Sequence, residues 1–320
     1  MNQSKKITDG ALLTAIFMVL LFVTILVPVV SIIAMFLLPV PFIIYGSRYD
    51  WKPTLLMLAV AMLLTTLFAT VFSLPIAVLM GLGGLMIGSA IYQNVSAYET
   101  WARGTFGFII GLLFVFVYTQ VLFDINWIEE FELIVAQSMQ MSTELLEQFG
   151  VGSEQATEAQ EMMEEQVNLL TDLFPVGLAV AAILLAFISQ WASYKMINRI
   201  ERKELRFPPF RTLQFPVSII WIYLFALLLS FIELDSGNIF YLGAQNLLML
   251  TGLLMSLQGF SFIFFYAHHK KMSKALPIIS VVLAVIFPPL MLYLVRILGI
   301  IDIGFRLRDR LTGNEDKRKK

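Results

Sequence analysis

The chain has 320 residues, of which 58% are hydrophobic and 14% are charged, and its mean hydropathy is +0.81. Soluble domains are about 45–50% apolar and about 25% charged, so this composition excludes a water-soluble globular protein and indicates a multi-pass membrane protein. The sequence contains no cysteine, which excludes disulfides, thiolate catalysis and cysteine metal sites.

Long apolar runs follow one another along the chain. Each run is expected to be a helix, because lipid offers no hydrogen-bond partner to backbone amides. The first begins after Lys5 and Lys6 and predicts an uncleaved helical hairpin that turns at Pro28, with arms at 11–26 and 30–45. Further spans are predicted at 54–72, 76–92, 104–123, 174–194, 217–231 and 242–266.

The last apolar stretch, 275–303, is interrupted by Pro288 and Pro289 and fits either one span or a short hairpin. We favour the hairpin, because it returns the basic tail, 306–320, to the same side as the other basic loops. The predicted fold class is therefore all-α, a polytopic transmembrane helical bundle of about 8–10 spans.

Lysine and arginine set the predicted orientation, because they are retained on the cytoplasmic side of the membrane. Alternating spans place the basic N-terminus and the basic loops at 195–211 and 270–274 on one side. We therefore expect a bacterial cell-membrane protein whose N-terminus and C-terminus are both cytoplasmic, with the segment 124–172 outside. The lipid bilayer is its first expected partner.

The segment 124–172 is strongly acidic, since it holds about half of the 23 acidic residues and no lysine or arginine. Apolar residues recur in it at helical spacing, and Gly150 and Ser153 are a typical helix end and a typical helix start. These features predict an external amphipathic helical hairpin. We interpret it as a solvated cap; a lid over a ligand site or a cation-attracting surface is the alternative.

Short motifs carry a resemblance to known families. The first six spans resemble the substrate-binding subunits, or S-components, of energy-coupling-factor transporters; the motifs are ALLTA at 11–15, LPVPF at 38–42 and MGLGGLMIG at 80–88. The whole chain resembles the YybS-type uncharacterised bacterial membrane proteins, through GAQN at 243–246, LQG at 257–259 and LGIID at 298–302.

The S-component resemblance implies that residues 1–197, with the insertion 124–172, form a six-helix core around a small-molecule pocket that opens outward. Residues 198–305 would add further transmembrane helices, before the basic cytoplasmic tail at 306–320. The resemblance also implies that Ala11 and Ala15 dock on a transmembrane coupling subunit that works with ATPases. Small residues four apart allow close helix approach, which could equally serve packing within the chain.

Polar side chains inside the spans are candidate binding groups, because they are costly in lipid unless they have a partner. The predicted outer-half set for a small-molecule ligand is Tyr118, Thr119, Gln120, Thr66 and Thr70. A second polar set lies in the 242–266 span and consists of Gln245, Asn246 and Gln258. Such groups suit an uncharged or zwitterionic solute, although hydrogen bonding between helices would use them too. We expect no buried Asp or Glu within a span.

Signatures of catalysis are absent from the sequence. The chain's two histidines, His268 and His269, adjoin two lysines and are interpreted as interface anchors. The zinc-protease, phosphate-loop and esterase motifs do not occur, so we predict no enzyme, cofactor, metal or nucleic-acid partner. The leading hypothesis is a transporter-type subunit that binds a small solute and is energised by a partner complex. The alternative is a membrane scaffold or regulatory protein that keeps the fold without a ligand site.

Overall fold

The computed structural model describes residues 3–148, 167, 169–232, 238–273 and 275–318. The chain divides into two compact units, Met1–Phe207 and Pro208–Lys320, which we describe separately. The regular elements in the described residues are all helices, and eight of the described segments are long and apolar enough to cross a membrane. The predicted all-α, multi-pass class is therefore confirmed. The functional domain boundaries given above stay predictions.

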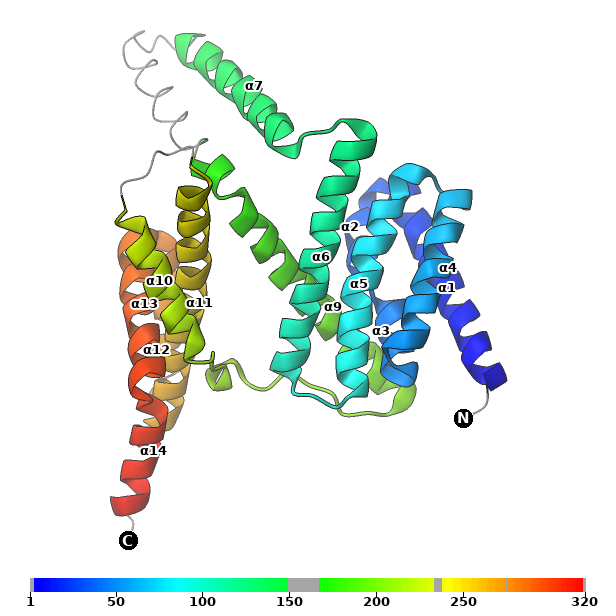
Figure 1. Ribbon diagram of the computed structural model, residues 1–320. Coiled ribbons are helices and arrows are strands. Elements are labelled where there is room, and N and C mark those ends of the chain that lie inside the picture. Colours follow the sequence, from blue (N-terminus) through cyan, green and yellow to red (C-terminus); the bar gives the residue numbers. More distant parts are fainter. Residues whose placement is uncertain (1–2, 149–166, 168, 233–237, 274, 319–320) are drawn as a thin grey trace. The chain divides into compact units, whose positions relative to one another are not determined.

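The first unit contains the N-terminal helices (Figure 1). Their bounds are α1 Gln3–Leu26, α2 Pro28–Leu37, α3 Val40–Tyr49, α4 Trp51–Phe68, η1 Val71–Ser73, α5 Leu74–Tyr92, α6 Ala97–Phe123, α7 Trp127–Gln148 and α9 Phe174–Glu201. Proline stands in the first turn of α2, α5 and α9, where its missing N–H costs nothing. Ser96 caps α6 by accepting a hydrogen bond from the amide of Glu99.

The predicted turn at Pro28 is confirmed, but the second arm is not one regular helix. It consists of α2 and α3, separated at Leu38 and Pro39. Proline has no amide hydrogen to continue the α2 hydrogen-bond ladder. The amide of Leu38 closes α2 by donating to the carbonyls of Ala34 and Met35. Residues Pro28–Tyr49 together still have the length of one span.

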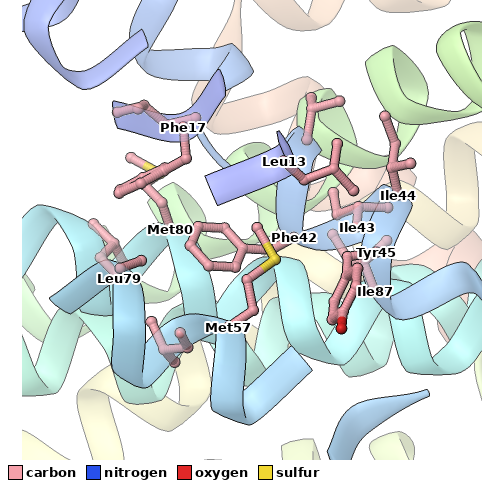
Figure 2. Packing of buried hydrophobic residues seen from close by; sticks show 14 of the residues in the cluster. Leu13, Phe17, Phe42, Ile43, Ile44, Tyr45, Met57, Leu79, Met80 and Ile87 are labelled. Carbon is pink, nitrogen blue, oxygen red and sulfur yellow. The ribbon is translucent and has the colours of Figure 1, made fainter. Parts of the chain in front are cut away.

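Aromatic, aliphatic and thioether side chains form the core of the first unit (Figure 2). Phe17 of α1 and Phe42 of α3 are fully buried and meet edge to face, with ring centroids 5.0 Å apart. The glycine-rich run of α5 lets α3 approach closely: a Cβ atom on Gly88 would lie 2.8 Å from the carbonyl oxygen of Ile43. This run therefore serves helix packing.

The amphipathic insertion is described only in its first half, as α7. The indole Nε1 of Trp127 donates to Thr119 Oγ1 at 2.7 Å and fixes the start of α7 to α6. The second predicted helix, with its start at Ser153, lies largely outside the described residues.

The second unit consists of helices, and its last apolar stretch is divided in two at Pro288. Its elements are η2 Phe210–Thr212, α10 Ser218–Ser230, α11 Ile239–His269, α12 Ala275–Ile286, α13 Pro288–Phe305 and α14 Leu307–Arg318. Contacts advance together along α11 and α13, from Gly252 with Arg296 to Gln258 with Asp302. The two helices therefore run parallel. Because α12 lies between them in the sequence, it must run in the opposite direction. The chain has the hairpin, with its bend at Phe287 and Pro288.

The hairpin predicts which loops lie on the same side of the membrane. Single cysteines at Ser273 and Thr312 are expected to react with a membrane-impermeant maleimide from one face of the membrane, and a cysteine at Asn238 from the opposite face. The natural chain has no cysteine, so no background needs to be removed. If the cysteines at positions 238 and 312 reacted from the same face, the hairpin would be wrong.

Candidate functional site

The two alanines predicted to dock a partner are both exposed on α1. The opposite side of the helix is buried through Leu13, Phe17 and Leu21, so α1 presents one face to the core and one away from it. Ala11 and Ala15 line a groove of about 920 Å³ formed mainly by α1, α3 and α4. The structure therefore places this small-residue pair where another molecule can reach it.

An ion-pair network holds the helices at one end of this groove. Arg48 of α3 donates from Nη1 to Asp9 Oδ2 at 3.0 Å and from Nε to Glu201 Oε1 at 2.6 Å. The hydroxyl of Tyr49 also donates to Asp9 Oδ2, at 2.9 Å, and Lys203 contacts Glu201 Oε2 at 2.9 Å. These ion pairs join α1, α3 and α9. They therefore fix α1 and α3, which both line the groove, relative to each other.

The predicted solute-binding groups bond mainly to backbone carbonyls. Thr66 donates to Met62 O at 2.9 Å, and Thr119 donates to Val115 O at 2.9 Å. Both are turn-to-turn bonds within one helix. Tyr118 donates to Val71 O at 3.1 Å, which brings α6 beside η1, where Thr70 contacts Ser73.

Gln120 is exposed, as are Thr66 and Thr70. The structure thus brings Tyr118 close to the segment that follows Thr70. A shared solute site for the whole set stays a prediction.

The second unit contains a buried pair of charged side chains that its sequence did not predict. Asp302 of α13 is 1% exposed and Arg308 of α14 is 6% exposed. Arg308 donates to Asp302 Oδ2 from Nε and from Nη2, both at 3.0 Å. The expectation that no span holds a buried carboxylate is therefore wrong. Asp302 lies in the last turn of α13.

Gln258, a predicted polar residue of α11, joins this pair. Its Nε2 donates to Asp302 Oδ2 at 2.6 Å, and its Oε1 accepts from the amide of Phe215 at 3.0 Å. Arg308 also reaches Arg211 O at 2.8 Å and Ser261 Oγ at 3.1 Å. Gln258 thus ties α11 to α13 and to the segment before α10, and Asp302 extends this network to Arg308 of α14.

The other two polar residues predicted in this helix lie away from the charge pair. Asn246 donates to Leu242 O at 2.8 Å within α11, about three turns before Gln258, and Gln245 beside it is half-buried. His268 and His269 are the last two residues of α11, and the His269 ring stacks on Phe265. Within the described part of the chain, no group of three or more His, Asp or Glu side chains could hold a metal ion.

In the described residues, eight apolar helical segments of spanning length define a multi-pass integral membrane protein. The chain belongs to the DUF2232 family of predicted membrane proteins, whose family model matches residues 15–303. It is 30% identical over 311 residues to "Uncharacterized protein YybS" of Bacillus subtilis (strain 168), and the alignment covers 97% of this chain and all of that relative. No solved structure matches it. The predicted YybS-type relationship is confirmed, and the S-component resemblance stays a prediction.

Proposed function

We propose that the protein is a non-enzymatic, transporter-type subunit of the bacterial cell membrane. It binds a small solute, and a partner complex containing a transmembrane coupling subunit and ATPases supplies the energy. The observation that carries this proposal is the exposure of Ala11 and Ala15 beside the groove. In the proposed orientation the N-terminus and C-terminus are cytoplasmic and 124–172 is external, as the lysine and arginine distribution favours.

The physical basis is the shape of α1. We call Ala11, Leu12, Ala15 and Ile16 the α1 docking face; all four are exposed. In lipid, helices associate by close packing, and small side chains four residues apart allow two backbones to approach. The alanines form a shallow notch, and Leu12 and Ile16 supply apolar edges that a partner helix can cover.

One observation favours the alternative function, a membrane scaffold or regulatory protein without a ligand site. The hydroxyls of Thr66, Tyr118 and Thr119 are already bonded to carbonyl oxygens of the chain. A solute would have to compete with these bonds. A specific solute retained through purification would decide for the transporter-type subunit.

Tryptophan at either alanine tests the docking. We expect Ala11→Trp and Ala15→Trp to reduce the amount of ATPase that co-purifies with the protein about tenfold or more, because an indole fills the notch and keeps the partner backbone away. Quantitative mass spectrometry of the complex purified from its native membrane measures this ratio.

The matched control is Ala59→Trp, which adds the same bulk at an exposed alanine of α4 away from the groove. It should leave the co-purifying ATPase unchanged. Undiminished association in both α1 variants would contradict docking through this face.

A further inference from the structure

The groove beside α1 changes from polar to apolar along its length. Its polar lining comes from the first turns of α1 and from the junction of α3 and α4, and includes Lys6, Tyr45, Asp50 and Lys52. Further along α4 the lining is aliphatic and includes Leu56, Val60 and Leu64. This gradient has the polarity of a phospholipid, with a charged head and hydrocarbon chains.

The length of the groove also fits one leaflet. At 1.5 Å per residue, α4 rises about 18 Å from Lys52 to Leu64, and α1 rises about 14 Å from Lys6 to Ala15. Half of a bilayer hydrocarbon core is about 15 Å. A lipid whose headgroup lies at the lysines therefore has room for its chains beside the aliphatic wall.

The two lysines at the polar end are not neutralised by the described part of the fold, although Lys52 Nζ lies 5.6 Å from the centroid of the adjacent Trp51 ring. Among the described residues, neither Lys6 nor Lys52 forms an ion pair, whereas the neighbouring Arg48 is paired with both Asp9 and Glu201. Two lysine ammonium groups without an ion-pair partner in the described residues thus line the polar end of the groove.

We propose that this groove binds one anionic phospholipid. The phosphate lies between Lys6 and Lys52. The acyl chains lie along Val60 and Leu64. Phosphatidylglycerol carries one net negative charge and two acyl chains, as this site requires. A zwitterionic lipid lacks the net charge, and its ammonium would face the two lysines.

Native mass spectrometry of the isolated full chain tests the site. The purified protein is equilibrated with equal amounts of phosphatidylglycerol and phosphatidylcholine in detergent, and the retained lipids are counted. We expect preferential retention of phosphatidylglycerol. The double variant Lys6→Gln, Lys52→Gln should reduce the retained phosphatidylglycerol about tenfold or more, because each lysine contributes to anionic lipid binding.

Two further variants separate charge from shape. Lys5→Gln removes a neighbouring exposed charge that does not line the groove and should change nothing. Val60→Trp fills the aliphatic part and should reduce retention with both lysines intact. Thermal unfolding midpoints equal to that of the natural chain would show that each variant is folded.

Equal retention of both lipids, or retention of phosphatidylglycerol unchanged by Lys6→Gln, Lys52→Gln, would overturn the proposal. Displacement of the lipid by inorganic phosphate would assign the lysines to a free anion and would also overturn it. Ala11 and Ala15 also line this groove, so a docked partner and the lipid would occupy it in turn. The measurement uses the isolated chain and leaves both alanines unchanged. Its failure is therefore distinguishable from a failure of the proposed docking.

Discussion

Arg308→Met is expected to lower the free energy of unfolding by about 3–5 kcal/mol. The substitution leaves Asp302 buried without its counter-charge, and removing one partner of a buried ion pair costs this much. The substitution also removes the hydrogen bonds from Arg308 to Arg211 O and Ser261 Oγ, which hold the segment before α10 against α11. Thermal unfolding of the purified protein in detergent measures the loss.

A double-mutant cycle isolates the pair. Asp302→Leu alone leaves the Arg308 guanidinium buried and unpaired, whereas Asp302→Leu with Arg308→Met removes both charges. We expect the double variant to be less destabilised than the sum of the two single variants. Arg310→Met is the matched control, because Arg310 is exposed on the same helix. Additive single effects would mean that the two charges do not interact.

Gly259→Ala is also expected to lower the free energy of unfolding strongly. A Cβ atom at Gly259 would collide with the carbonyl oxygen of Val295, and one at Gly299 would collide with that of Met255. The obstacle is the backbone of a packed helix and not the end of a flexible side chain. Overpacking of this kind costs about 1–3 kcal/mol or more, and α11 and α13 must separate to accommodate the methyl group.

The same helix offers a control substitution that is expected to raise stability instead of lowering it. Gly243 of α11 has nothing within 4 Å of the position of an added Cβ atom. Gly243→Ala should therefore stabilise the helix by up to about 1 kcal/mol through helix propensity. Thermal unfolding midpoints compare the two variants. A Gly259→Ala protein as stable as Gly243→Ala would contradict the close packing of α11 on α13.

The spans could be predicted from the sequence because the bilayer imposes one rule on every apolar run. Pro28 and Pro288 mark the two bends at which the structure begins α2 and α13. The division of α2 from α3 at Leu38 and Pro39 was harder to predict, because a proline inside a span can kink the helix or end it. Which outcome occurs depends on the neighbouring helices, which the sequence alone does not place.

The polar residues were less predictable, because composition gives a side chain's chemistry but not its partner. Thr119 looks available in the sequence, but its hydroxyl donates to a carbonyl one turn earlier. No buried carboxylate was expected within a span, but Asp302 lies in the interior beside Gln258. Gln258 within the LQG motif and the aspartate within LGIID were the available signals for this contact.

Site-specific crosslinking from α1 tests the proposed docking most directly. A photoreactive diazirine side chain of leucine size, placed at Leu12, would be activated in native membranes, and the same probe at the exposed Leu63 of α4 serves as control. Docking through α1 predicts that the probe at position 12, and not the one at position 63, crosslinks to a transmembrane protein that co-purifies with an ATPase. Crosslinks from position 12 to lipid alone, or to the same proteins as from position 63, would contradict it.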